Sequence, residues 1–297
     1  MNKSLIALIL LSVIIVSGAD GCPTGQQEAE QVSSGLEVSF VDQAPPISVP
    51  VNTPFPIYVE LLNKGGEFIN KGEAKVYLSG VGTNLEGVKD AQINERNLAK
   101  KSLSPDRIVF AEAAKFTFPI ESLHALPLAL KSCYTYGTST QASICVSQSN
   151  KTGLCEVGSE KIKSTSNSVA PIQITSIKEE VVGNKLSVFF TIENKLGGSV
   201  YLPDTDCDGL QAKEISESFK EDKVKVLIRT TEKGFDCKLQ ANEAPYAPIE
   251  DLSGTANLGT VVCEKELDGN EEYVVPFSIV TRYKYVDTSV KTINILP

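Results

Sequence analysis

Apolar and polar residues alternate along most of the chain, and a period of two is typical of β-strands with one buried face. Clusters of Gly, Asn, Asp and Pro separate the alternating runs, as strand-linking turns require. Helical periodicity is weak, and only residues 85–98 and 213–219 are candidates for short connecting helices. The strands expected from the pattern are 36–40, 55–61, 74–78, 116–120, 188–192, 224–228 and 273–279. Many short strands without βα alternation predict an all-β chain of antiparallel sandwiches.

The chain also resembles itself, which indicates a duplicated domain. Residues 57–66 read IYVELLNKGG and residues 188–198 read VFFTIENKLGG, each an alternating strand that runs into Asn-Lys and a glycine pair. Residues 133–146 (CYTYGTSTQASICV) align without a gap with residues 282–295 (RYKYVDTSVKTINI). Both copies keep Tyr-x-Tyr, a Ser/Thr-rich segment that we interpret as a turn, and an alternating return strand.

This repeat predicts two tandem immunoglobulin-like β-sandwich domains, at residues 35–155 and 168–297. The Lys/Ser/Thr-rich stretch 156–167 has little apolar content and is the expected linker. The length of 297 residues suits two domains of ordinary size.

The N-terminus has the layout of an export signal. Lys3 precedes an almost unbroken apolar run at residues 5–16, which is too short to span a bilayer as a helix. Ser17 and Ala19 fit a small-x-small cleavage site, whereas Cys22 is a candidate for lipid attachment. We therefore expect residues 1–22 to be a signal peptide or a membrane or lipid anchor, and the polar residues 23–34 to be a flexible tether. Lipidation, simple secretion and an uncleaved anchor remain alternatives.

Seven cysteines fit an oxidising compartment, because removal of Cys22 leaves an even number and the chain contains no C-x-x-C pair. The repeat aligns Cys133 and Cys145 with Arg282 and Asn294, so both cysteines are lost together. Opposed positions in a hairpin lie within disulfide reach, which favours a Cys133–Cys145 bond. Cys237–Cys263 is the second expected pair, and Cys155–Cys207 follows by elimination. Six buried free thiols are the alternative.

Composition argues against several classes of function. The net charge of −9 disfavours a nucleic-acid partner, which requires a concentrated basic face. His124 is the one histidine and stands in no nucleophile motif, so we expect no catalytic residues. Phosphate-binding loops and dinucleotide fingerprints are absent from the sequence.

Three local motifs are candidate sites, and two of them have alternative interpretations. Asp204, Asp206 and Asp208 with Gly209 match the start of a calcium loop, but Ile215 stands where a bidentate Glu belongs, so an acidic turn is the alternative. Calcium is the one candidate cofactor. The tyrosine pairs at 134/136 and 283/285 are either an aromatic binding stripe or packing on a sheet face. Asn150 begins an Asn-Lys-Thr glycosylation sequon.

Residues 35–40, Ala44-Pro45-Pro46 and the segment from Pro54-Phe55 to Gly66 resemble the opening of CARDB-like immunoglobulin-type surface domains. The segment from Cys133 to Cys155, followed by Ala170-Pro171-Ile172, resembles exported archaeal proteins of unknown function. The resemblance implies an adhesion-related or envelope scaffold and supplies no catalytic residue. We therefore expect a non-enzymatic, exported cell-surface binding or scaffolding protein whose partners are other envelope proteins or glycans, with the membrane contacted through the N-terminal segment. The alternative is a subunit of a surface filament or coat, assembled when residues 36–41 add as a strand to the next copy.

Overall fold

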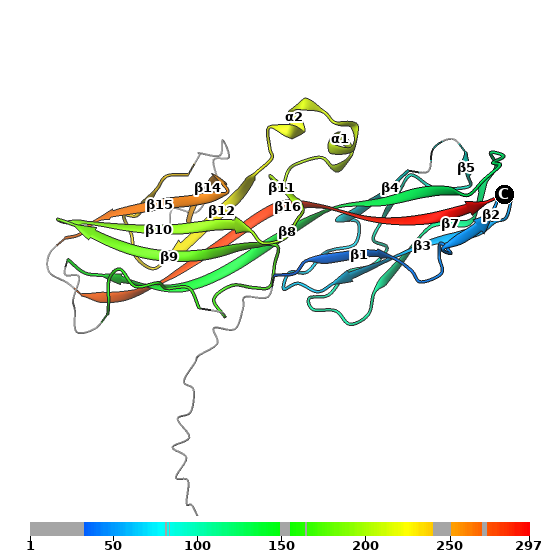
Figure 1. Ribbon diagram of the computed structural model, residues 1–297. Coiled ribbons are helices and arrows are strands. Elements are labelled where there is room, and N and C mark those ends of the chain that lie inside the picture. The colour runs from blue at the N-terminus through cyan, green and yellow to red at the C-terminus, as the bar shows by residue number, and fades with distance from the viewer. Residues whose placement is uncertain are drawn as a thin grey trace, which may run out of the picture.

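The computed structural model describes residues 33–80, 82, 84–148, 155–163, 165–239, 251–268 and 272–297. These residues form three sheets, almost entirely antiparallel, and two short helices (Figure 1). The all-β class is therefore confirmed. The expected leader (1–22) and all of the expected tether except Ser33 and Ser34 lie outside the described residues.

One long sheet runs the length of the molecule, and two four-stranded sheets cover one of its faces. The long sheet has the order β14 (Asp251–Asn257), β12 (Lys223–Thr230), β16 (Tyr273–Leu296), β8 (His124–Val146), β4 (Ala74–Ser79) and β6 (Ala91–Ile93), with β2 (Ser48–Pro50) and β11 (Ser199–Tyr201) also paired to β16. The first covering sheet has the order β1 (Leu36–Phe40), β3 (Phe55–Asn63), β7 (Asp106–Phe116) and β5 (Leu85–Glu86). The second has the order β13 (Asp236–Cys237), β15 (Gly259–Glu266), β10 (Lys185–Asn194) and β9 (Ile172–Val182).

β8 and β16 join the two ends of the molecule, because each is a single strand that passes through both. They pair along their whole lengths, from His124 opposite Ile295 to Val146 opposite Tyr273, in one uninterrupted antiparallel register. Residues 124–136 of β8 and 286–296 of β16 lie under the first covering sheet and, with β1–β7, form the first lobe. Residues 137–146 and 273–285 lie under the second covering sheet and, with β9–β15, form the second lobe.

The two halves of the sequence therefore exchange strands. The second half of β8 leaves the first lobe and enters the second, and the second half of β16 makes the reverse crossing. The expected domains 35–155 and 168–297 consequently do not separate in space. The turns expected in the Ser/Thr-rich segments of residues 133–146 and 282–295 are wrong, because both segments continue as strand. Threonine-rich segments favour strands as well as turns, and here each half offers the other a strand edge to pair with.

Side-chain alternation explains why both covering sheets lie on the same face. Leu128 in the first lobe and Ile144 in the second lobe are both even-numbered residues of β8, and both are fully buried. On β16 the residues buried beneath the covering sheets are odd-numbered, such as Phe277 and Ile293, because they lie opposite the even residues of β8. We call this the inner face. One apolar cluster runs through both lobes beneath the covering sheets.

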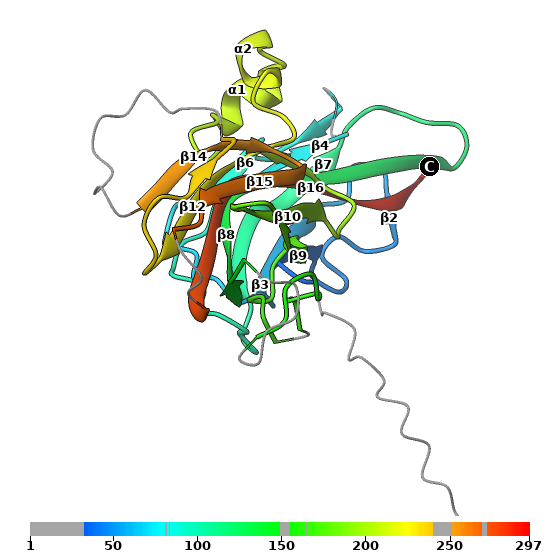
Figure 2. The same ribbon diagram turned by 90° about the vertical axis from the view of Figure 1, so that its left-hand side faces the viewer.

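The outer face of the long sheet carries α1 (Cys207–Ala212) and α2 (Ile215–Ser218), which project from that face in both views (Figures 1 and 2). α2 confirms the short helix expected at 213–219. The helix expected at 85–98 is wrong, since that stretch contains β5 and β6, and residues 117–120 follow the end of β7 instead of forming a strand.

Candidate functional site

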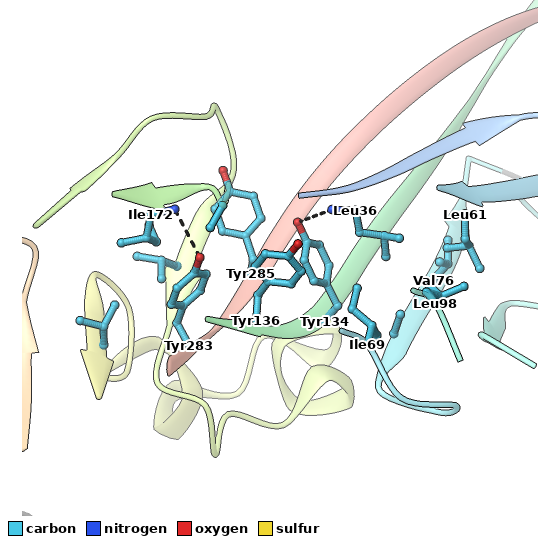
Figure 3. Close-up of a cluster of buried hydrophobic side chains, with 14 of the residues drawn as sticks. Leu36, Leu61, Ile69, Val76, Leu98, Tyr134, Tyr136, Ile172, Tyr283 and Tyr285 are labelled. Atoms are coloured by element: carbon cyan, nitrogen blue, oxygen red, sulfur yellow. Dashed lines mark hydrogen bonds between the residues drawn. The ribbon is translucent and has the colours of Figure 1, made fainter. Parts of the chain in front are cut away.

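Four tyrosines meet where the two lobes join, on the inner face of the long sheet. Tyr134 lies opposite Tyr285 and Tyr136 lies opposite Tyr283 across β8 and β16. Their ring centroids are 5.8 and 6.5 Å apart respectively, and all four side chains are buried (Figure 3). We call this cluster the tyrosine junction. Of the two interpretations of these pairs, packing is confirmed and a surface binding stripe is wrong.

The hydroxyl groups of the junction hold the first residues of the covering sheets. The Tyr134 hydroxyl accepts a hydrogen bond from Leu36 N at the start of β1, and the Tyr283 hydroxyl accepts one from Ile172 N at the start of β9 (Figure 3). The two hydrogen bonds are 3.2 and 3.3 Å long, so a tyrosine hydroxyl holds the first strand residue in the same way in both lobes.

The other two tyrosines bind the repeated Asn-Lys-Gly-Gly turns. Tyr136 donates to Asn63 Oδ1 at 3.0 Å, and Tyr285 donates to Asn194 Oδ1 at 3.1 Å. In each turn the asparagine amide also donates to a carbonyl four residues later, at Glu67 and Gly198. The two repeated motifs therefore contact each other in the same way in both lobes. The tyrosine junction lies on the pseudo-two-fold axis that relates the two lobes.

Glycine is required in both turns because a tyrosine lies against the backbone. A Cβ atom on Gly65 would lie 1.9 Å from the Tyr136 hydroxyl, and one on Gly198 would lie 2.6 Å from a ring carbon of Tyr285. Burial raises the pKa of Tyr136 to about 12 and raises the pKa of Tyr134 well above its ordinary value. The junction therefore stays neutral, and its chemistry is structural.

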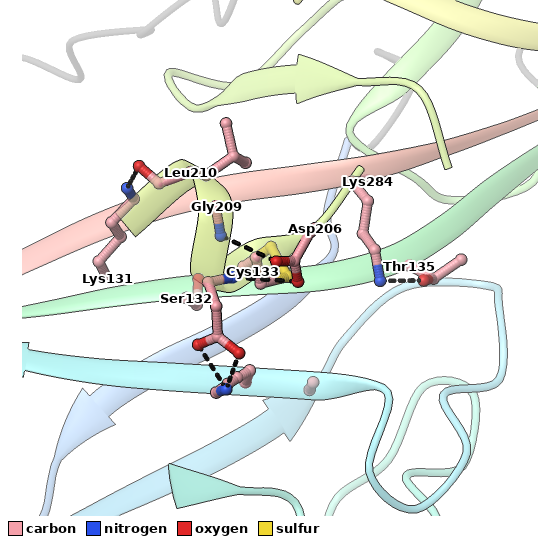
Figure 4. The surroundings of a disulfide bond; sticks show 12 residues. Lys131, Ser132, Cys133, Thr135, Asp206, Gly209, Leu210 and Lys284 are labelled. Atoms are coloured by element: carbon pink, nitrogen blue, oxygen red, sulfur yellow. Dashed lines mark hydrogen bonds and ion pairs between the residues drawn. A yellow bond between two sulfur atoms is a disulfide. The ribbon is translucent and has the colours of Figure 1, made fainter. Parts of the chain in front are cut away.

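A disulfide fixes a small excursion of the chain to the outer face of the first lobe. Residues 202–222, which contain α1 and α2 and which we call the knob, are joined to β8 by the Cys133–Cys207 bond (Figure 4). Cys133 is the neighbour of Tyr134, so the two side chains point to opposite faces of the strand. Lys131 Nζ adds a hydrogen bond to Leu210 O of α1 (Figure 4).

The aspartates proposed as a calcium loop are used to build and hold the knob. Asp206 caps α1 by accepting from the backbone N–H groups of Asp208 and Gly209. Asp208 pairs with Lys75 Nζ at 2.6 Å and accepts from the Tyr77 hydroxyl at 2.8 Å, and the Lys75 contact lowers the pKa of Asp208. Asp204 lies 3.7 Å from Lys220. Within the described residues no group of acidic, His or Cys side chains is arranged to hold a metal.

Two expected disulfides are wrong and one is confirmed. Cys133 and Cys145 lie on the same continuous strand, so at about 3.3 Å per residue they are about 40 Å apart and cannot bond. Cys145 instead bonds to Cys155, which follows the end of β8, and Cys207 is therefore not available to Cys155.

The expected pair Cys237–Cys263 joins facing positions of β13 and β15. Three disulfides among the described residues indicate folding in an oxidising compartment.

A buried carboxylate lies beside the Cys145–Cys155 bond. Glu179 Oε1 accepts from Cys145 N at 2.6 Å, and Glu179 Oε2 lies 3.2 Å from Lys161 Nζ. The carboxylate is fully buried, and burial raises its pKa. Lys161 belongs to the expected linker, and its backbone N–H donates to Ile177 O of β9. This part of the linker therefore packs against β9.

The outer face of the second lobe is open where the first lobe carries its knob. A groove of about 520 Å³ runs over β12, β16 and β8, with Lys225, Leu227, Ser253, Val280, Arg282 and Gly137 among its lining residues. Glu67 pairs with Arg282 at 2.7 Å at the edge of this groove. Sequence reasoning missed the groove, although the alignment of Arg282 with Cys133 was its one local signal.

The remaining candidates are not brought to the groove. His124 begins β8 in the first lobe and packs against the ring of Phe116, 5.9 Å between centroids. Cys22 and Asn150 lie outside the described residues.

Comparison with known proteins leaves the family open. No protein-family model matches the chain, and no curated protein matches it. Among solved structures, the secreted serine protease VesC from Vibrio cholerae matches with 11% identity and a TM-score of 0.20, over 86% of this chain and 51% of that chain. The chain thus spans about half the length of VesC, and a TM-score this low supports no shared fold or activity. Among the described helices, none is long and apolar enough to cross a membrane.

Proposed function

We propose that this chain is a non-enzymatic, exported surface protein that displays the outer face of its long sheet to binding partners. The observation that carries the proposal is the opposite placement of two neighbours on β8. Tyr134 holds Leu36, near the start of the described chain, on the inner side, and Cys133 holds the knob on the outer side. A membrane anchor within residues 1–22, followed by the tether at residues 23–34, would therefore turn the groove and the knob away from the membrane.

Rigidity supports a scaffolding role. The lobes share two strands, a tyrosine junction and one continuous core, so they form a spacer that does not bend at a linker. Partners on this view are other envelope proteins or glycans. The groove offers charged side chains and a concave surface to a partner. His124 packs on Phe116 in the first lobe and therefore lies away from the groove, which is over the second lobe.

Surface labelling and mass spectrometry test the proposal. Intact cells treated with a membrane-impermeant amine reagent should be modified at Lys213 and Lys225, and the mature chain should lack residues before the cleavage site. If Cys22 carries lipid, Cys22→Ser should release the protein from membranes. Recovery of the chain in the cytoplasm with reduced thiols would contradict the proposal.

The filament alternative meets one obstacle. Its expected donor strand is residues 36–41, and residues 36–40 pair with β3 of the same chain, so they would have to leave β3 before adding to another copy. Sedimentation of the purified ectodomain distinguishes the two functions, because a stable monomer at high concentration fits the scaffold and growth in mass with concentration fits the filament.

A further inference from the structure

The open groove of the second lobe is the internal counterpart of the surface that the knob covers in the first lobe. Lys75 lies opposite Cys133 on β8, and Lys225 lies opposite Arg282 on β16. Continuing across the long sheet, Cys133 lies opposite Val286 and Arg282 lies opposite Gly137. The two rows are related by the pseudo-two-fold axis at the tyrosine junction.

A second pair of rows extends the match. Ala91, Tyr77 and Lys131 lie side by side on β6, β4 and β8 in the first lobe. Ser253, Leu227 and Val280 lie side by side on β14, β12 and β16 in the second. Each of these three, like the row through Lys225, lines the groove.

The first lobe shows what such a surface holds. α1 lies on it, Asp208 forms an ion pair with Lys75 at 2.6 Å, and Leu210 packs with Tyr77 and Cys133 in a small apolar cluster. The occupant is therefore a short segment of polypeptide that combines a carboxylate with an apolar side chain.

The second lobe keeps this recognition chemistry and has no such occupant among the described residues. Lys225 is exposed, and no described residue forms an ion pair with it. Leu227 and Val280 make the floor more apolar than Tyr77 and Lys131 do, and Arg282, which pairs with Glu67, stands in the place of Cys133. The described residues that line the groove include no aromatic ring on which a sugar would stack, which favours a peptide over a glycan.

We propose that the second-lobe groove binds an acidic segment of a partner protein, in the manner in which the first lobe holds α1. This inference rests on the proposed function, because it names the chemistry of the partner for the same outer face. The partner would place a carboxylate on Lys225 and an aliphatic side chain against Leu227 and Val280.

Disulfide tethering with the knob's own sequence tests the proposal. The probe is a capped peptide of residues 204–212, whose Cys207 would bond to an Arg282→Cys variant as it bonds to Cys133. Ser278→Cys, on the same outer face of β16, is the matched control. In a thiol–disulfide buffer the yield at Arg282→Cys should exceed the yield at Ser278→Cys about tenfold, because recognition raises the effective concentration of the peptide. Replacing Asp208 of the peptide by Asn, or adding Lys225→Glu, should remove most of the preference.

A second measurement avoids the new cysteine. A fluorescent peptide of residues 204–212 with Cys207→Ser should bind the unaltered protein and lose at least about tenfold in affinity to Lys225→Glu, about 1.4 kcal/mol. Lys178→Glu, an exposed lysine on β9, makes the same change of net charge elsewhere and should leave binding unchanged. Equal tethering at positions 282 and 278, or binding insensitive to Lys225→Glu, would overturn the proposal.

The tests also separate this inference from the proposed function. Soluble alginate that protects the Arg282→Cys thiol from alkylation, when the peptide does not, would identify a glycan as the occupant and overturn the peptide proposal while leaving surface display intact. Cytoplasmic recovery of the chain would contradict the proposed function whatever the peptide does.

Discussion

Tyr136 of β8 lies opposite Tyr283 of β16, and the two residues come from different copies of the same repeated motif. Tyr134 and Tyr285 form the second such pair. A repeat that pairs with itself in this way has a two-fold axis between its copies, like a dimer whose subunits exchange strands. The chain therefore has the architecture of a strand-exchanged pair fused into one polypeptide.

The first prediction concerns the junction hydroxyls. Tyr136→Phe and Tyr285→Phe should each lower the free energy of unfolding by about 1–2 kcal/mol, because each removes two hydrogen bonds of an Asn-containing turn. Tyr136 loses its bonds to Asn63 and to Glu67 N, and Tyr285 loses its bonds to Asn194 and to Gly198 N. Urea denaturation measures both losses. Tyr58→Phe is the control, since its hydroxyl binds Glu112 at the exposed surface and its removal should cost less than about 0.5 kcal/mol. Equal losses in all three variants would contradict the role of the junction.

Alkaline pH should unfold the protein through the same cluster. Burial raises the pKa of Tyr134, Tyr136, Tyr283 and Tyr285 in the folded state. The stability that this contributes is fully present below pH 10, the ordinary tyrosine value, and is lost as pH rises through the raised values, which for Tyr136 is about 12. Phenolate absorbance and circular dichroism should therefore change together above pH 10. Full titration of all tyrosines with native circular dichroism would contradict this.

Strand exchange predicts that the two fragments of a cleaved chain stay associated. A protease site inserted at Gly158, between β8 and β9, separates the two sequence halves, and reduction then opens the Cys133–Cys207 bond that still joins them. Size-exclusion chromatography should show both fragments eluting together until denaturant is added, because β8 and β16 remain paired across 124–146 and 273–295. Two independent sandwiches would elute as separate species.

A single cysteine substitution followed by peptide mapping tests the disulfide pairing. Cys133→Ser should leave Cys207 open to alkylation and Cys145 protected, as mapped by mass spectrometry of non-reduced peptides. Loss of a bond that closes 74 residues should lower the free energy of unfolding by about 2–4 kcal/mol. Alkylation of Cys145 in this variant would restore the hairpin pairing that the sequence suggested.

Acid pH tests the buried carboxylate. Burial raises the pKa of Glu179, so its contribution to stability is fully present below the ordinary glutamate value near 4.5 and is lost as pH rises through the raised value. Glu179→Gln keeps the shape and cannot ionise. The stability of the unaltered protein should therefore fall relative to Glu179→Gln as pH rises above the ordinary glutamate value near 4.5, and parallel pH profiles would contradict the assignment.

Local patterns in the sequence were sufficient for the all-β class, for most strands and for the positions of both repeats. Val188, Phe190 and Ile192 alternate because every second residue of a strand faces the core, and this information is present in any window of a few residues. The Asn-Lys-Gly-Gly and Tyr-x-Tyr motifs were visible as well, and in the structure the second binds the first. The position of Cys237 and Cys263 in the same half of the chain, each near a strand end, was also enough to pair them.

Pairing between distant strands was decided only by the tertiary structure. A Ser/Thr-rich segment such as 137–141 can turn back on itself or continue straight, and the choice depends on whether a distant partner, here 278–282, offers a free strand edge. The straight course carries Cys145 into the second lobe and leaves Cys133 facing the knob, so the same choice reassigned two disulfides and removed the domain boundary. It also created the groove at Lys225, because residues from five segments of the chain meet there only after the strands have exchanged. Side-chain alternation is a local property that the sequence expresses directly, whereas strand partners are set by the free energy of the whole sheet.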